Sequence, residues 1–271
     1  MNTVIYSELI KLYPLKRAII TGAGSGLGLE LTKLLLQDGW KIAALDINVK
    51  ALEKYQSEYL SIHEVDITDR ILLQQTIEKF CIAHKGIDIL FNNAGVGEGT
   101  LFKDYSLEHW DWIININLKA IIDATYFVLP EMHKANSGLI VNMASMAGIA
   151  NLPRMSPYNV TKAALISLSE TLNHELCHTD ITVTCIAPTF FKSSIMQHSK
   201  GDVKTVSSAH KTVENSSITS MDAAKIILKN LHRKKEVIRF PFSAHAFFYS
   251  RRFMPSLYKR IVRLFLFKKT T

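Results

Sequence analysis

The sequence is poor in cysteine and has no long apolar run, and each absence argues against a class of protein. Its 271 residues include three cysteines, Cys81, Cys177 and Cys185, without C-x-x-C spacing. Such cysteines are typical of reduced thiols in a cytoplasmic protein. No uninterrupted apolar run approaches the roughly 18–20 residues of a transmembrane helix. The apolar N-terminus contains Glu8 and Lys11 and lacks a small-residue cleavage site, so we expect no signal peptide.

Acidic residues are almost missing from the C-terminal part of the chain. The net charge is +8, but residues 229–271 hold twelve Lys/Arg against one acid, Glu236, so this segment carries +11 and the remainder −3. After Pro255, large apolar side chains fall on one helical face and cations towards the other: Leu257, Ile261, Leu264 and Phe265 against Lys259, Arg260 and Arg263. This pattern predicts a basic amphipathic helix, which suits an anionic membrane surface.

Residues 251–271 are therefore a candidate for peripheral contact at the inner membrane surface. A helix packed on the protein body with a solvated basic face, or a contact between subunits, would show the same pattern. We expect no nucleic acid partner, because the rest of the chain is slightly acidic and carries no recognition motif.

Apolar runs bounded by turn residues alternate with helical patterns along the chain. We expect strands at 17–21, 41–47, 59–66, 87–95, 138–145 and 181–188, and helices at 29–39, 69–84, 106–129 and 156–176. This alternation predicts an α/β doubly wound Rossmann fold, with a central parallel sheet of about seven strands and helices on both faces. We expect one domain over residues 1–240 and an extension over 241–271. The polar segment 199–217 suggests a solvated loop or a flap over a binding site.

The usual dinucleotide fingerprint G-x-G-x-x-G is also missing. Residues 21–28, TGAGSGLG, fit T-G-x-x-x-G-x-G instead. They occupy the first strand-to-helix turn, where glycines let the backbone approach a pyrophosphate and a helix N-terminus supplies amide groups. A plain tight turn is the alternative. The candidate cofactor residues of this turn are Gly22, Ser25, Gly26, Leu27 and Gly28.

Asp46 follows the glycine turn at the distance that suits a carboxylate bonded to an adenosine ribose. No Arg or Lys occupies positions 23–28 or 46–49 to compensate a 2′-phosphate. We therefore predict NAD as the cofactor, with NADP less favoured, and no metal. An aspartate that only ends a strand or caps a helix is the alternative.

Tyr158 and Lys162 are four residues apart and project from one face of a predicted helix. Ser156 is a good N-cap and Pro157 a good first helical residue. A phenol has a pKa of about 10 and needs a depression of roughly two to three units to exchange protons near neutral pH. An adjacent ammonium can supply this. Alone, Y-x-x-x-K is common on ordinary helices.

Together these residues resemble the classical short-chain dehydrogenases/reductases (SDR). The resemblance rests on T-G-x-x-x-G-x-G at 21–28, NNAG at 92–95, Ser145 after the strand at 138–145, and Tyr158-x-x-x-Lys162 thirteen residues later. It covers roughly residues 15–190. It implies an NAD-dependent oxidoreductase that interconverts an alcohol and a ketone by hydride transfer, in a homodimer or homotetramer.

The resemblance also implies roles for single residues. Tyr158 would exchange a proton with the substrate oxygen, Lys162 would lower its pKa and hold the nicotinamide ribose, and Ser145 would bond the substrate oxygen. A strand-end turn is the plain alternative for Ser145. Asn117 would anchor a water-mediated proton relay, with Asn115 as its rival. A buried asparagine bonded only to backbone is the alternative reading of Asn117.

The remaining cofactor contacts implied by the resemblance are Asn93, Ala94 and Gly95 beside the adenine and the sheet, Asp66 and Ile67 at the adenine, and Pro188 near the nicotinamide. The alternative for Asn93, Ala94 and Gly95 is a plain strand-end turn, and the alternative for Asp66 is a helix N-cap. Members of this family usually have glycine after this proline, whereas this sequence has Thr189. A threonine allows fewer backbone conformations than a glycine. Phe190, Phe191, Ile195 and Met196 suggest an apolar substrate, although core packing explains the phenylalanines equally well.

Two functions of other classes are possible with this fold. The first is a catalytically silent NAD-binding sensor, and the second is a membrane-docked scaffold. The complete set of Asn, Ser, Tyr and Lys argues against the sensor, because a binder has no need of an acid/base pair.

Overall fold

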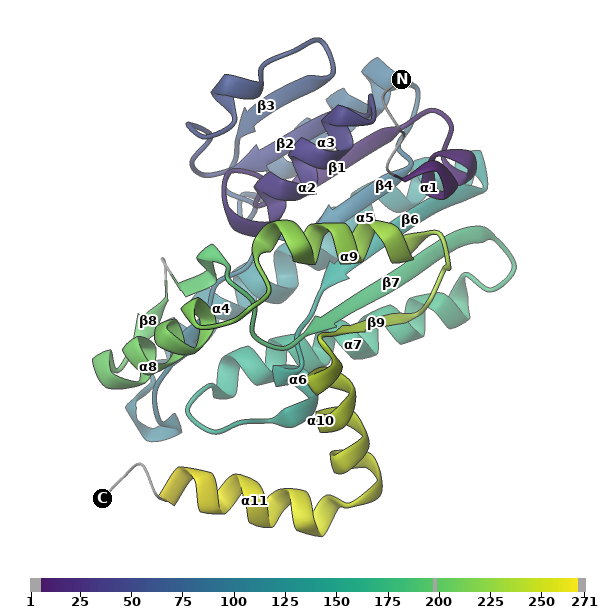
Figure 1. Cartoon of the computed structure of the whole chain (residues 1–271). Coiled ribbons are helices and arrows are strands. Elements are labelled where there is room, and N and C mark those ends of the chain that lie inside the picture. The colour runs from purple at the N-terminus through teal and green to yellow at the C-terminus, as the bar shows by residue number, and fades with distance from the viewer. Residues whose placement is uncertain (1–5, 197–198, 268–271) are drawn as a thin grey trace.

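The central sheet is parallel and has seven strands in the order β3-β2-β1-β4-β6-β7-β9 (Figure 1). The computed structural model describes residues 6–196 and 199–267, apart from the side chains of Met196 and residues 265–267. The strands are β1 (Arg17–Thr21), β2 (Lys41–Asp46), β3 (Leu60–Glu64), β4 (Ile89–Asn92), β6 (Ser137–Met143), β7 (Asp180–Pro188) and β9 (Val237–Phe240). The strand order reverses between β1 and β4, so the crevice outside their carboxyl ends is the expected ligand site.

Helices cover both faces of the sheet, which confirms the doubly wound fold. The helices α2 (Gly26–Gln37) and α9 (Ser220–Leu231) pack on one face with Ala18 and Ile20. Ile19 points to the opposite face, because side chains alternate along a strand, and joins α3 (Arg70–His84) and α5 (Ala120–Ala135) there. In Figure 1, α9 crosses in front of the sheet, whereas α5 and α7 (Ser156–Glu175) lie behind it.

The helix predicted over 106–129 is longer and contains a π-helical turn. It runs through α4 (Leu107–Ile114), the π-turn η3 (Asn115–Lys119) and α5. By length and composition the stretch Leu107–Ala135 could cross a membrane. It packs on α3, β4 and β6. Core helices of soluble proteins can have the same length and composition, so this observation is weak evidence for a membrane span.

The prediction of a loop over 199–217 is wrong, because most of this segment is helical. A two-residue strand, β8 (Lys200–Gly201), pairs with β5 (Glu98–Gly99), and α8 (Val203–Glu214) follows. Asp202 caps α8 by accepting from the amides of Lys204 and Thr205. Ala209 and Val213 of α8 line the main cavity, which agrees with the alternative reading as a flap.

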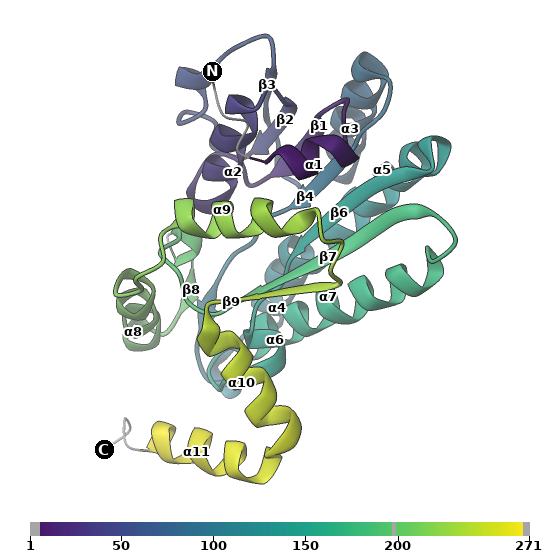
Figure 2. The same cartoon turned by 45° about the vertical axis from the view of Figure 1, so that its right-hand side comes forward.

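The C-terminal residues form two helices, α10 (Phe242–Phe253) and α11 (Pro255–Phe267). Figures 1 and 2 show α10 leading away from the sheet and α11 lying at the end of the molecule opposite α1 (Ser7–Leu12). The hydroxyl of Tyr258 donates to the carbonyl of Ala150 at 2.8 Å and so holds α11 against α6 (Ala147–Ala150). The helix predicted after Pro255 is thus confirmed, and the Phe265 side chain lies outside the described residues.

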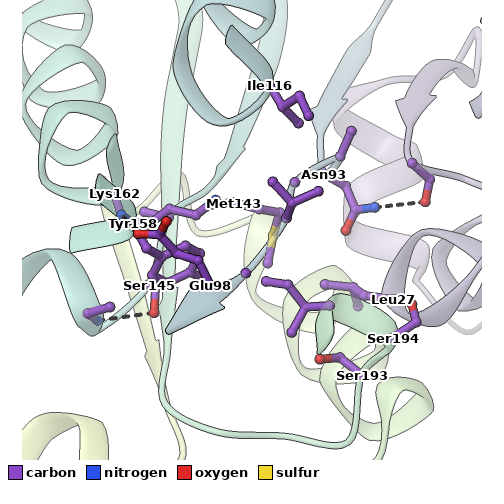
Figure 3. Close-up of a pocket in the computed structure, with 18 of the residues that line it drawn as sticks. Leu27, Asn93, Glu98, Ile116, Met143, Ser145, Tyr158, Lys162, Ser193 and Ser194 are labelled. Atoms are coloured by element: carbon purple, nitrogen blue, oxygen red, sulfur yellow. Dashed lines mark hydrogen bonds between the residues drawn. The ribbon is translucent and has the colours of Figure 1, made fainter. Parts of the chain in front are cut away.

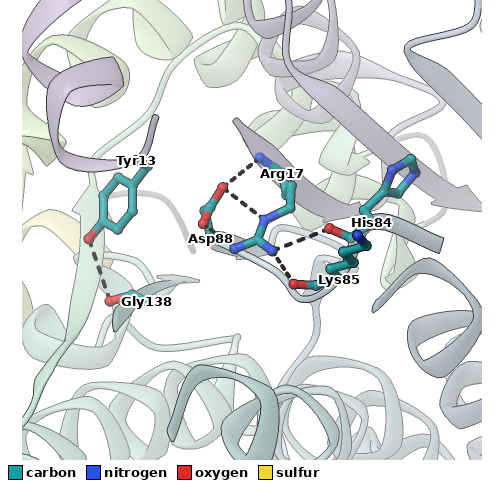
Figure 4. A network of polar contacts seen from close by, with 6 residues as sticks. All are labelled: Tyr13, Arg17, His84, Lys85, Asp88 and Gly138. Atoms are coloured by element: carbon teal, nitrogen blue, oxygen red, sulfur yellow. Dashed lines mark hydrogen bonds and ion pairs between the residues drawn. The ribbon is translucent and has the colours of Figure 1, made fainter. Parts of the chain in front are cut away.

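A buried ion pair fixes the end of the sheet remote from the crevice (Figure 4). The Arg17 guanidinium of β1 donates to both carboxylate oxygens of Asp88, which precedes β4, at 2.7 and 3.2 Å. It also donates to the carbonyls of His84 and Lys85, which end α3. Burial of two charges is tolerated when their donors and acceptors are satisfied, so this network joins β1, β4 and α3.

Candidate active site

A cavity of about 580 Å³ opens at the carboxyl ends of the parallel strands. Cavities of roughly 300–1,000 Å³ hold cofactors and small ligands. Its wall includes most of the site residues predicted from the sequence: Gly22, Ser25, Leu27, Asp46, Asp66, Ile67, Asn93, Ala94, Gly95, Ser145, Tyr158, Lys162 and Pro188. Gly26, Gly28 and Asn117 lie outside the wall.

The glycine turn is required by the protein's own packing. A Cβ at Gly28 would lie 2.0 Å from the carbonyl oxygen of Gly22, so α2 can approach β1 only with glycine there. Gly22 has φ +65° and lies against Ala94. The turn also starts α2 at Gly26, and the first amides of a helix have no partner within it. The tight-turn and the anion-binding interpretations are therefore compatible.

The segment 92–95 is fastened to this turn. The side-chain amide of Asn93 donates to the carbonyls of Thr21 and Gly22, at 3.0 Å each. The hydroxyl of Thr21 accepts from the amides of Asn93 and Ala94, at 3.1 Å each. These bonds span β1 and β4 across the point where the strand order reverses, and they hold the two sides of the crevice in a fixed relation.

Two aspartates lie at the end of the cavity next to β2 and β3. Asp46 accepts from the amides of Gly24 at 2.7 Å and Asn48 at 3.0 Å. Asp66 accepts from the amide and hydroxyl of Thr68. The N-cap of α3 is Asp69, so the helix-cap interpretation of Asp66 is wrong. A local turn orders the Asp66 carboxylate, whereas Asp46 is also bonded to the glycine turn, and both border the cavity.

Ser145, Tyr158 and Lys162 meet at the opposite end of the cavity, whereas Leu27, Ser193 and Ser194 lie across from them (Figure 3). The Lys162 ammonium donates to the carbonyl of Met143 at 2.7 Å and lies 5.5 Å from the centre of the Tyr158 ring. The Ser145 hydroxyl accepts from the amide of Ala147 at 3.1 Å. Ser145 follows β6, and Tyr158 and Lys162 are on α7, which contacts β6.

Burial sets the protonation of this group. It raises the pKa of Tyr158 to about 12, although a hydrogen bond with Ser145 opposes the rise. Burial also lowers the pKa of Lys162 to about 8, while the nearby Cys185 raises it. The expected depression of the phenol pKa by Lys162 is therefore not found. The physical reason is that desolvation disfavours the charged form of both groups.

Asn117 belongs to the π-turn and is fully buried. Its side-chain oxygen accepts from the amide of Val96 at 2.8 Å, and its nitrogen donates to the carbonyl of the same residue at 2.9 Å. The alternative reading of a buried asparagine bonded to backbone describes this geometry. Asn117 thereby shapes the segment that follows Gly95 and does not border the cavity.

The residues after β7 close one side of the cavity. Pro188, Thr189, Phe190, Phe191 and Ile195 contribute to the wall. Phe191 also packs on Phe240, with ring centres 6.2 Å apart, so lining and core packing coincide at this ring. The side chain of Met196 lies outside the described residues.

Sequence reasoning missed two charged residues of the wall, Glu98 and Lys200. The Glu98 side chain has no solvent exposure and lies in the cavity wall together with Tyr158 and Lys162 of α7. Burial raises its pKa to about 7. The only signal in the sequence is an acidic residue three positions after the NNAG segment, which by itself does not indicate burial.

Comparisons with known proteins agree with this geometry. A model of the short chain dehydrogenase family matches residues 16–204. The 3-oxoacyl-(acyl-carrier-protein) reductase of Thermotoga maritima is 34% identical over 188 residues, which are 67% of this chain and 76% of the relative. An uncharacterized oxidoreductase of Staphylococcus aureus (strain USA300) is 27% identical over 226 residues, 82% of this chain and 93% of the relative.

Solved structures share the fold. A short-chain dehydrogenase/reductase of Burkholderia phymatum in complex with NAD superposes with a TM-score of 0.82 at 24% identity, over 89% of this chain and 94% of the other. A serine dehydrogenase complexed with NADP+ superposes with a TM-score of 0.76 at 27% identity, over 84% of this chain and 95% of the other.

The chain belongs to the short-chain dehydrogenase family. The family is one of nicotinamide-dependent oxidoreductases that act on CH–OH groups, so the class of reaction follows from membership. The cavity residues fit such a dinucleotide, because the glycine turn and the two aspartates line one end and the Tyr158 group the other.

Proposed function

We propose that this protein is an NAD-dependent oxidoreductase that interconverts an alcohol and a ketone on an apolar substrate. The observation that carries the proposal is the meeting of Ser145, Tyr158 and Lys162 in one cavity with the glycine turn. When bound, the nicotinamide supplies or accepts the hydride. The protein's own residues then have to place the substrate oxygen and move one proton.

Tyr158 is the residue that moves this proton. With a pKa raised to about 12 by burial, its phenol is protonated at neutral pH and can donate to the oxygen of a ketone as the hydride arrives at carbon. Ser145 holds the same oxygen through its hydroxyl, and Lys162 places positive charge near the phenolate that remains. This protonation state favours reduction at neutral pH, and the reverse oxidation should accelerate as the pH rises.

The first test replaces the phenol. We expect Tyr158→Phe to lose turnover at least 100-fold, since general acid–base groups contribute about 10²–10⁴-fold, while NADH binding stays within a few-fold of the wild type. The assay follows NADH absorbance with a panel of ketones of increasing chain length. Turnover unchanged in Tyr158→Phe, with any competent ketone, contradicts the mechanism.

The second test addresses the choice of cofactor. Asp46 borders the cavity, and no cation at 23–28 or 46–49 compensates a 2′-phosphate. We expect NADH to bind more tightly than NADPH in fluorescence titrations, and Asp46→Ser to narrow the gap. Asp69→Ser, at the cap of α3, is the control because Asp69 lies outside the cavity wall. Equal or reversed affinities in the wild type contradict the role given to Asp46.

The apolar substrate is inferred from the closing residues. Phe190 and Ile195 line the cavity from one side, and Trp112 and Met155 line it from another. The sensor alternative is not favoured, because Tyr158, Lys162 and Ser145 are assembled as a proton-transfer group requires.

We further propose a cytoplasmic homo-oligomer whose residues 251–271 make peripheral contact with an anionic membrane. The described part of α11 supports this contact: Leu257, Ile261 and Leu264 are 43–58% exposed, and no acidic residue follows Glu236.

A further inference from the structure

The helix that carries Tyr158 and Lys162 has no N-terminal cap of its own. Its N-cap residue is Met155, which offers no side-chain acceptor, and not Ser156 as the sequence suggests. Pro157 has no amide hydrogen, and the amide of Asn159 is the first to bond within the helix, to the carbonyl of Met155 at 2.8 Å. The amide of Tyr158 therefore needs an acceptor from elsewhere, because the first amides of a helix have no partner within it.

Glu98 supplies that acceptor from sixty residues earlier in the chain. Its Oε1 accepts from the Tyr158 amide at 2.8 Å. A cap side chain normally accepts from the amide of the second or third helical residue, and Tyr158 is the third residue of α7. A carboxylate at this position also suits the positive end of the helix dipole. Figure 3 shows Glu98 beside Ser145 and Tyr158.

The second oxygen of Glu98 faces α4 and has no hydrogen-bond partner among the described residues. Oε2 lies 3.2 Å from Nε2 of His109 on α4. The hydroxyl of Tyr105 accepts from the amide of Thr100 at 3.2 Å, two residues after Glu98. Glu98 itself is in β5, which β8 pairs in register Glu98↔Lys200. The backbone of Glu98 is thus held by β8, and its carboxyl group lies between α4 and the first turn of α7.

We propose that Glu98 is a positioning residue of the reaction: it caps α7 at the amide of Tyr158 and so fixes the phenol in the cavity. The proposal goes beyond the family's Ser, Tyr and Lys, and its structural part does not rest on the proposed function. It predicts that losing the acceptor loosens the first turn of α7, whereas losing only the negative charge does not.

The pH response separates this role from ordinary packing. Burial raises the pKa of Glu98 to about 7. The titratable groups around it are Tyr105, His109, Lys200 and the Tyr158 phenol. Burial raises the pKa of Tyr105 and of Tyr158, whereas burial and Lys200 lower that of His109. Lys162, one turn along α7, has its pKa lowered to about 8 by burial, so Glu98 is the group here whose pKa lies nearest 7. Its proton weakens the bond to the Tyr158 amide.

The test uses the full chain labelled with ¹⁵N-tyrosine, with the Tyr158 amide signal identified by its loss in Tyr158→Phe. In the wild type we expect this signal to move as the pH passes through about 7. In Glu98→Gln it should keep slow hydrogen exchange, because an amide oxygen replaces the acceptor, but it should not titrate. In Glu98→Ala its exchange should accelerate at least tenfold. Tyr105→Phe is the matched control, because it removes a neighbour of Glu98 and leaves Oε1 in place.

Two outcomes overturn the proposal: Tyr158 exchange that is the same in Glu98→Ala and the wild type, and Tyr158 exchange that accelerates in Glu98→Gln as much as in Glu98→Ala. If Glu98→Ala does not fold, the pH titration of Glu98→Gln still tests the proposal. A Tyr158 amide signal that moves with pH in Glu98→Gln as it does in the wild type overturns the role given to Glu98.

A kinetic arm depends on the proposed function. With a competent ketone, Glu98→Ala should lower kcat by up to about 100-fold, the cost of a small misplacement of a reacting group, with KM nearly unchanged. Glu98→Gln should restore kcat to within a few-fold. If the protein reduces none of the ketones, the result counts against the proposed function. The hydrogen-exchange experiment then still tests the role of Glu98. A wild-type kcat in Glu98→Ala overturns the positioning role.

Discussion

Tyr158 and Lys162 lie one turn apart on α7, and both side chains are almost fully buried. Y-x-x-x-K spacing correctly indicates that they share a face. The spacing could not indicate their protonation, because that depends on the apolar wall contributed by other elements. Within the described residues Lys162 donates one hydrogen bond, to the carbonyl of Met143, and its ammonium loses more hydration than this bond returns. A lysine in this environment is expected to destabilise the folded protein.

Replacing Lys162 by methionine should therefore stabilise the fold at neutral pH. The folded-state pKa of about 8 lies below the ordinary lysine value of 10.5, so the unfolded chain binds more protons between these two pH values. The contribution of this group to stability therefore rises with pH in that range. We expect Lys162→Met to melt a few degrees above the wild type at pH 7, with the gap narrowing above pH 8. Thermal melts of both proteins at several pH values from 7 to above 8 test this prediction. Lys79→Met, at an exposed lysine, is the control. A gap that widens with pH contradicts the assignment.

At the scale of elements, the sequence predicts the strands and helices that have a strong apolar pattern. Elements that depend on contacts with distant parts of the chain are not evident from the sequence. The strand expected at 17–21 matches β1. In contrast, the segment 199–217 is polar and weakly patterned, which indicates a loop or a flap, and it contains α8. Its helix depends on the Asp202 cap and on Val213 packing over the cavity. Likewise β9 is four residues long, and its pairing with β7 comes from the fold.

The same distinction applies to the site. Most of the predicted cofactor-binding residues directly follow strands, so motifs that occur in a fixed order along the sequence indicate where they lie. The side chains of Glu98 and Asn117 contact Tyr158 and Val96. The family resemblance indicates Asn117, whereas no motif or spacing marks Glu98. Glu98, which reaches the site from a distant segment, is therefore a residue that the sequence could not predict.

The ion pair of Arg17 and Asp88 allows a prediction at this scale. Removing one partner of a buried pair leaves an uncompensated charge and costs about 3–5 kcal/mol. We expect Asp88→Ala to lower the free energy of unfolding in urea by about this amount. Lys11→Ala, which breaks the exposed pair with Glu8, should cost at most about 1 kcal/mol. Similar losses in the two variants contradict a structural role for the buried pair.

At the scale of the whole molecule, the cavity lies beside the basic C-terminal helices. Phe247 of α10 lines the cavity, and Tyr258 ties α11 to Ala150, another lining residue. The Tyr258 side of α11 faces the protein, so Leu257, Ile261 and Leu264 are left exposed. A second copy of the chain would bring like charges together on this segment, whereas an anionic bilayer complements them.

This arrangement predicts binding of the full chain to anionic vesicles, in which the apolar stripe inserts and the cations meet the headgroups. The protein should float with vesicles that contain phosphatidylglycerol and not with phosphatidylcholine alone, and high salt should weaken the binding. Ile261→Glu should abolish flotation, whereas Ile82→Glu, at a position 79% exposed on α3, should leave it intact. Flotation unchanged in Ile261→Glu removes α11 from the contact. A change of subunit number in that variant, without any vesicle binding by the wild type, assigns the stripe to a subunit interface instead.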